Sequence, residues 1–130
     1  MQLETNDLIT WNIGKYKFYD LHSLGTPYYY VHPAKQLAMY HVMERARDRL
    51  DIQAIIVFGS SVHDYHFFRS DLDLCLIGIL GGDFRYKELE CADISFDFLK
   101  VESFPTLFKL SQEPGSVYQR ICREGVLFIC

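Results

Sequence analysis

The chain has 130 residues, of which 49% are hydrophobic and 15% are aromatic, and its formal net charge is −4. This length and composition favour one globular domain with a real core and argue against disorder. The negative charge argues against a broad nucleic-acid-binding surface, which would need an excess of lysine and arginine. No apolar run approaches the roughly 20 residues of a membrane span, and no signal peptide is visible, so we expect a cytoplasmic protein.

The first part of the chain divides into an extension and the start of the main domain. Residues 1–33 predict an N-terminal extension with a β-hairpin, because β-forming residues flank Asn12-Ile13-Gly14. The run of tyrosines at residues 28–30 either covers the core or offers a surface to a partner or substrate. Residues 34–130 predict one further domain, which opens with a helix over residues 34–50. The apolar residues of this helix recur at helical spacing: Leu37, Ala38, Met43, Ala46 and Leu50.

A strand over residues 55–58 leads into a motif that suggests phosphate and metal binding. It is followed by Gly59-Ser60, ten residues, and Asp71-Leu72-Asp73. Gly59 permits a sharp turn close to a ligand, and the next residue can offer a hydroxyl and an N–H to an anion. Two carboxylates spaced two apart on a strand share a face and repel each other unless a cation lies between them. Mg²⁺, held by carboxylates and substrate phosphates, meets that need.

The second half of the chain adds one more carboxylate and the remaining elements. Residues 92–101 alternate well enough for a strand, with Asp97 on the face opposite Phe96 and Phe98. Two helices are predicted next, over residues 102–110 with Ser103 as a cap and over residues 117–123 with Ser116 as a cap. Val126–Ile129 predicts a last short strand.

The order of these features is similar to that of a known family. Gly-Ser, ten residues and Asp-x-Asp are followed by an aspartate among apolar residues, Phe96-Asp97-Phe98-Leu99, and by a helix, Arg-Glu-Gly-Val and an apolar strand within residues 116–129. Over residues 34–130 the chain resembles the minimal nucleotidyltransferases of the DNA polymerase β superfamily. The resemblance implies an α/β (α+β) fold of the polymerase-β-like nucleotidyltransferase type. This fold has a small mixed sheet flanked by helices, here preceded by the N-terminal extension.

The resemblance also implies roles for residues of the motif. Three carboxylates are expected to be catalytic and to hold metal, with two Mg²⁺ ions: Asp71, Asp73 and Asp97. The nucleotide phosphates are expected at Gly59 and Ser60. Relatives often carry an arginine soon after the Gly-Ser pair, and this chain does not. Arg69 is the candidate nucleotide-binding residue in its place.

The activity implied by this resemblance is transfer of a nucleoside monophosphate, by family habit AMP from ATP, to a protein or a small hydroxylated acceptor. Many stand-alone domains of the family resemble the antitoxin of a toxin-antitoxin pair, so a HEPN-type toxin is one expected partner. The missing arginine and the short segment between Asp73 and Asp97 leave a second function open, in which a catalytically weak domain of this fold docks to a partner protein. A homo-oligomer also stays open, and no membrane partner is expected.

Overall fold

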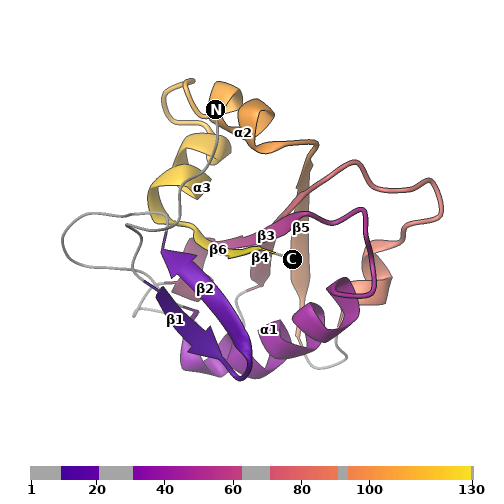
Figure 1. Cartoon of the computed structure of the whole chain (residues 1–130). Coiled ribbons are helices and arrows are strands. Elements are labelled where there is room, and N and C mark those ends of the chain that lie inside the picture. The colour runs from indigo at the N-terminus through magenta and orange to yellow at the C-terminus, as the bar shows by residue number, and fades with distance from the viewer. Residues whose placement is uncertain (1–9, 21–30, 63–70, 91–93, 130) are drawn as a thin grey trace.

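The computed structural model describes residues 10–20, 31–62, 71–90 and 94–129, and these residues form a mixed α/β protein. Six strands form one sheet in the order β1-β2-β6-β3-β4-β5 (Figure 1). The strands are β1 (Thr10–Ile13), β2 (Tyr16–Asp20), β3 (Ala54–Phe58), β4 (Leu72–Ile77), β5 (Phe96–Val101) and β6 (Val126–Ile129). The helices are α1 (Pro33–Ala46), α2 (Phe104–Leu110) and α3 (Val117–Glu124), with two short 3-10 helices, η1 (Gly59–Val62) and η2 (Tyr86–Leu89).

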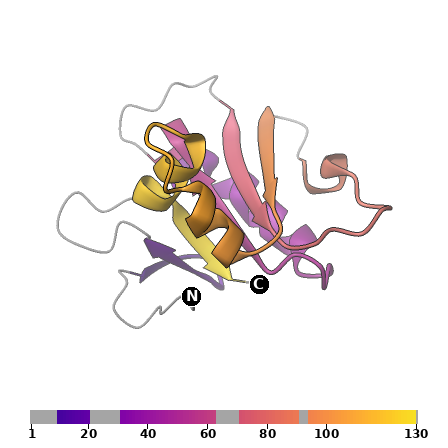
Figure 2. The ribbon, with the colours of Figure 1, turned by 90° about the horizontal axis from the view of Figure 1, so that it is seen from above.

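The sheet is mixed and lies between two helical layers. β4 and β5 are parallel, and every other pair of neighbouring strands is antiparallel. α1 covers one face, whereas α2 and α3 lie on the other (Figure 1 and Figure 2). Coverage on both faces explains why β3 and β4 are almost continuous apolar runs. The predicted mixed sheet flanked by helices is thus confirmed.

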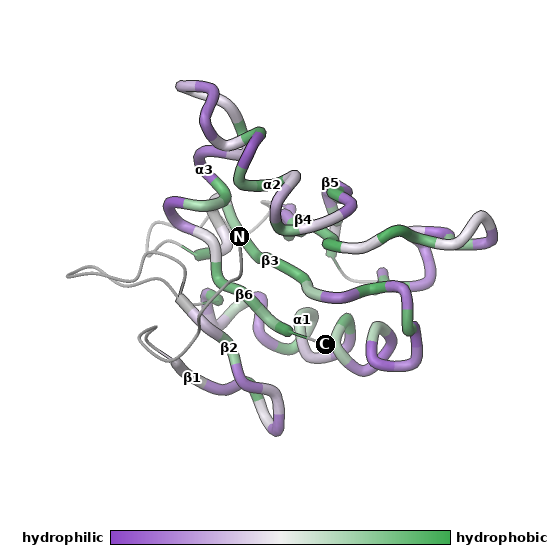
Figure 3. The backbone as a smooth tube through the Cα atoms, turned by 45° about the horizontal axis from the view of Figure 1, so that its top comes forward, coloured by the Kyte–Doolittle hydropathy of each residue, from purple (hydrophilic) through white to green (hydrophobic). Residues whose placement is uncertain are grey.

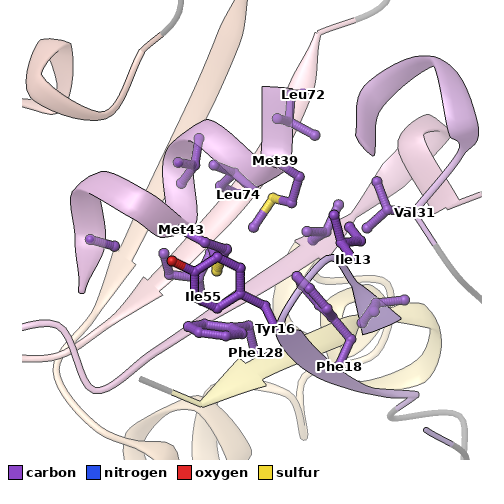
Figure 4. Packing of buried hydrophobic residues seen from close by; sticks show 14 of the residues in the cluster. Ile13, Tyr16, Phe18, Val31, Met39, Met43, Ile55, Leu72, Leu74 and Phe128 are labelled. Atoms are coloured by element: carbon purple, nitrogen blue, oxygen red, sulfur yellow. The ribbon is translucent and has the colours of Figure 1, made fainter. Parts of the chain in front are cut away.

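The predicted N-terminal hairpin is also confirmed, and it is part of the main sheet. β1 and β2 pair through a turn at Gly14, and β2 continues the sheet by pairing Phe18 with Phe128 of β6. The Tyr16 hydroxyl donates a hydrogen bond to the carboxylate of Glu44 in α1. Aromatic rings of the hairpin and of β6 pack together under α1 (Figure 4). The hairpin is therefore attached both to the sheet and to the helix.

The first helix forms, but its buried face differs from the prediction. Leu37 is 71% exposed and Leu50 is 99% exposed, so assigning them to the apolar face was wrong. Leu50 lies beyond the end of the helix at Ala46. Leu37 follows Lys35 by two residues, which is about 200° of helical rotation at ~100° per residue, so it lies on the side of the helix opposite the buried Lys35. The residues of α1 that are buried are Lys35, Met39, Val42, Met43 and Ala46.

Side chains of the strands alternate between two cores, one on each face of the sheet. The core beneath α1 contains these residues of β3 and β4: Ile55, Val57, Leu72, Leu74 and Leu76. The core beneath α2 and α3 contains the residues that alternate with these along β3 and β4: Ala54, Ile56, Phe58, Cys75 and Ile77. The apolar character of β3 and β6 at the centre of the molecule is visible in Figure 3. This alternation decides which face a polar side chain in a strand takes.

Candidate active site

Gly59 ends β3 and turns the chain into η1 directly beside a carboxylate. Its φ of +75° lies in the left-handed region that glycine adopts most easily. A Cβ placed on Gly59 would lie 2.4 Å from Oδ2 of Asp73. The glycine therefore serves two purposes, because it allows the turn and it leaves room for the carboxylate against the turn.

The register of the strands brings two predicted site residues together. In β4, Asp73 is opposite Phe58 of β3 on one side and opposite Asp97 of β5 on the other. Because Leu72 and Leu74 face α1, the side chain between them belongs to the opposite face, toward α2 and α3. Asp97 shares that face, since parallel strands in register point their paired side chains the same way. The strand predicted over residues 92–101 begins at Phe96 within the described part of the chain.

Burial and neighbouring charges act on Asp73. Burial, which is the largest cause, and the carboxylates of Asp97 and Asp71 together raise its pKa from 3.8 to about 6. Two cations, Arg120 of α3 and Lys35 of α1, oppose this rise. Asp73 is half-buried, whereas the other two carboxylates are exposed. The negative charges of Asp71, from the segment before β4, and of Asp97, from β5, thus both act on Asp73.

Hydrogen bonds connect the Gly-Ser turn to Asp71 and to the start of α1. The hydroxyl of Ser61, a fully buried residue, donates to the main-chain oxygen of Asp71 over 3.2 Å. The N–H of His32, the residue before α1, donates to the main-chain oxygen of Ser61 over 2.7 Å. The imidazole of His32 in turn caps the helix by accepting from the N–H of Ala34. The turn, the carboxylate segment and the helix start therefore form one connected unit.

Two cations near the carboxylates were not predicted. Lys35 is only 2% exposed, and it interacts electrostatically with Asp71 and Asp73. Its helical spacing to Met39 was the signal that could have placed it on the buried face. Arg120 lies in α3, where its Nε donates to Oε1 of the buried Glu124 over 2.7 Å.

Some predicted residues lie outside what the structure describes. Arg69 belongs to residues 63–70, which lie outside the described residues. The backbone of Ser60 belongs to η1, but its side chain also lies outside the described part of the structure. Among the described residues, no three His, Cys, Asp or Glu side chains lie close enough together to form a ready-made metal site. The donor chemistry nevertheless fits Mg²⁺. The carboxylates of Asp97 and Asp71 add to the effect of burial in raising the pKa of Asp73, and a hard divalent cation would relieve this repulsion between oxygen donors.

The raised pKa of Asp73 predicts a pH-dependent stability of the metal-free protein. Because the folded state binds this proton more tightly than the unfolded state, the group's contribution is greatest below pH 3.8 and is lost as the pH rises to about 6. We expect Asp73→Asn to match the wild type at pH 4 and to be more stable by about 1–3 kcal/mol at pH 7.5. Chemical denaturation in EDTA at both pH values measures this difference. Asp48→Asn, at an exposed carboxylate on the α1 side, is the control, and an equal difference at both pH values would contradict the prediction.

Comparisons of the chain with protein-family models, with curated proteins and with solved structures found no match. In the part of the chain that the structure describes, no helix has the length and apolar character needed to cross a membrane.

Proposed function

We propose that the protein is a magnesium-dependent nucleotidyltransferase with the polymerase-β-like fold, which transfers AMP from ATP to a hydroxyl group and releases pyrophosphate. The observation that carries this proposal is the register of β4 and β5. It pairs Asp73 with Asp97 beside the turn at Gly59, on the face of the sheet where α3 contributes Arg120. A glycine turn next to paired carboxylates suits a substrate that carries both phosphates and metal ions.

Each residue of the site has a role in this reaction. Asp71, Asp73 and Asp97 would hold the metal, which when bound supplies neutralisation of charge on the attacking and leaving oxygens. The exposed carboxylate of Asp97 can accept the proton of the acceptor hydroxyl, because it is open to an incoming substrate. The backbone of Gly59 and Ser60 at the start of η1 would bind phosphate oxygens.

The acceptor is the less constrained half of this proposal. The resemblance to stand-alone domains of the family favours a protein acceptor, with a HEPN-type toxin as the partner. A small, all-helical open reading frame beside this gene would support that pairing. Transfer of labelled AMP from ATP to the product of that reading frame would test it directly.

A second function is favoured by one observation. Among the described residues the carboxylates do not form a closed metal site as they stand. A domain that keeps this fold but works by docking to a partner would need no such site. The two functions differ in whether the protein binds a nucleotide with magnesium.

The deciding experiment is a calorimetric titration of ATP into the purified protein, with and without Mg²⁺. We expect binding that requires Mg²⁺ in the wild type, is lost in Asp73→Asn and is kept in Asp48→Asn. The two variants each remove one carboxylate, so a difference between them belongs to the position and not to the net charge. Absence of binding at millimolar ATP would reject the transferase and favour the docking function.

A further inference from the structure

Two large apolar side chains are exposed at the end of the sheet that lies away from the candidate active site. Strand β4 carries Asp73 near its first end and Ile77 at its other end, and four residues span about 13 Å along a strand. Beyond the second end, Leu50 precedes β3 and is 99% exposed, and Ile79 follows β4 and is 76% exposed. A partner that binds at this end therefore leaves the carboxylates open.

Close contacts hold the two segments that carry these side chains together. A Cβ on Gly78 would lie 2.0 Å from the main-chain oxygen of Asp51, so the lack of a side chain lets the segments approach this closely. The N–H of Gly81 also donates to Oδ2 of Asp51 over 2.8 Å. Leu50 and Ile79 are each next to a residue of this contact. They are therefore exposed on a bonded framework, as side chains that meet a partner without prior ordering would be.

A hollow of about 340 Å³ opens beside Ile79. Its lining consists of Gly78, Ile79, Leu80, Lys100 and Glu102. The two charged residues are both exposed, and they share one side of the chain because they are two residues apart at the end of β5. Among the described residues, neither has an ion-pair partner. The hollow thus combines apolar side chains with one positive and one negative charge at its rim.

These features match what a second copy of the same chain requires. In a two-fold dimer both copies present the same surface, so that surface must be complementary to itself. A rim with one lysine and one glutamate meets this condition, because Lys100 of each copy can face Glu102 of the other. An isoleucine beside an apolar hollow meets it too, because Ile79 of each copy can cover the hollow of the other. A single sign of charge at the rim would instead indicate a partner of different chemistry.

We propose that the protein forms a two-fold dimer through the surface made by Leu50, Ile79, Leu80, Lys100 and Glu102. In this dimer the exposed apolar side chains are covered, two ion pairs form at the rim, and the candidate active sites of both copies stay open. Because few side chains take part, we expect a weak, reversible dimer with a dissociation constant on the order of 10 µM. The dimer does not depend on whether the protein transfers AMP.

Charge reversal at the rim tests the pairing directly. Lys100→Glu leaves two negative charges at the rim and Glu102→Lys leaves two positive charges, so each variant alone should be monomeric where the wild type is dimeric. An equimolar mixture of the two variants should form a dimer with one copy of each, and the double variant should be dimeric again. Analytical ultracentrifugation at about 100 µM, roughly tenfold above the expected dissociation constant, measures all of these states.

The substitution Ile79→Lys tests the apolar part of the surface. The side chain is exposed, so the melting temperature of the monomer should stay close to that of the wild type, whereas the dimer should be lost. Leu37→Lys is the matched control, because Leu37 is similarly exposed but lies on α1, outside this surface. This variant should remain dimeric.

Three results would overturn the proposal. A wild-type protein that sediments as a monomer at about 500 µM, roughly fiftyfold above the expected dissociation constant, would show that the surface does not bind a second copy. A dimer that survives Ile79→Lys would be built on a different surface. A mixture of the two charge-reversal variants that stays monomeric would exclude the pairing of Lys100 with Glu102. Binding of ATP is measured separately, so none of these results bears on the proposed function.

Discussion

Asp97→Asn is expected to slow nucleotidyl transfer by roughly 10³-fold, within the range attributed to loss of a general base. The substitution keeps the shape of the side chain while removing the charge that would help hold metal and the atom that would accept the acceptor's proton. Because Asp97 is exposed, the fold should tolerate the change. Single-turnover transfer of labelled AMP measures the rate, and the melting temperature verifies the fold.

Glu102→Gln is the control for this experiment. Glu102 is an exposed carboxylate that follows the far end of β5 from Asp97. Its replacement by glutamine removes the same charge as Asp97→Asn without changing the site. We expect it to transfer AMP at the wild-type rate. An Asp97→Asn variant with a rate within tenfold of the wild type would show that the transfer chemistry does not use this carboxylate.

Gly59→Ala is expected to have the second large effect, on both stability and metal binding. The added Cβ would meet Oδ2 of Asp73 at 2.4 Å, and alanine would also have to adopt a φ of +75°. The backbone strain alone costs about 1–2 kcal/mol. Moving the carboxylate away from the turn should in addition weaken Mn²⁺ binding by at least about tenfold, because a small displacement of one ligand is sufficient to spoil a site.

Gly115→Ala separates these two effects. Gly115 has a φ of +77°, nearly the same as Gly59, but a Cβ there would have nothing within 4 Å. It should lose a similar amount of unfolding free energy from strain and keep its affinity for Mn²⁺. Equal Mn²⁺ affinities in the two alanine variants would contradict the idea that Gly59 makes room for the Asp73 carboxylate.

Most elements of the fold could be predicted because local signals mark their ends. Ser103 and Ser116 cap α2 and α3 by accepting from N–H groups of Thr106 and Gln119, as their positions before the helices indicate. β3 and β6 were visible as short apolar runs, and β5 was visible from its alternating pattern. The buried face of α1 could not be found by spacing alone, because helical periodicity leaves open which of several stripes meets the sheet. Only tertiary packing selects the stripe that includes Lys35 and excludes Leu37.

The parts of the site that lie close together in the sequence could be predicted. Asp71 and Asp73 are recognisable from their spacing on one strand and from the Gly-Ser pair ahead of them. The pairing of Asp73 with Asp97 is different, since it depends on a parallel register between strands that are joined by a crossover and not by a tight turn. No local pattern fixes such a register, so the prediction of Asp97 depended on the family resemblance. The cations from α1 and α3 depend on packing of helices against the sheet and left no motif to find.

The place of β6 has a consequence for how the molecule assembles. Although it follows all the other strands along the chain, it lies between β2 and β3 in the sheet. Until residues 126–129 leave the ribosome, the hairpin and the β3-β4-β5 unit have no strand to join them, and each presents an open edge. Completion of the sheet is therefore a late step that depends on contacts between distant parts of the chain. Such steps are slow, and the partly folded chain can aggregate through its open strand edges in the meantime. The strands that carry Asp73 and Asp97 can pair earlier, so the part of the sheet that holds the candidate site can form before the sheet is complete.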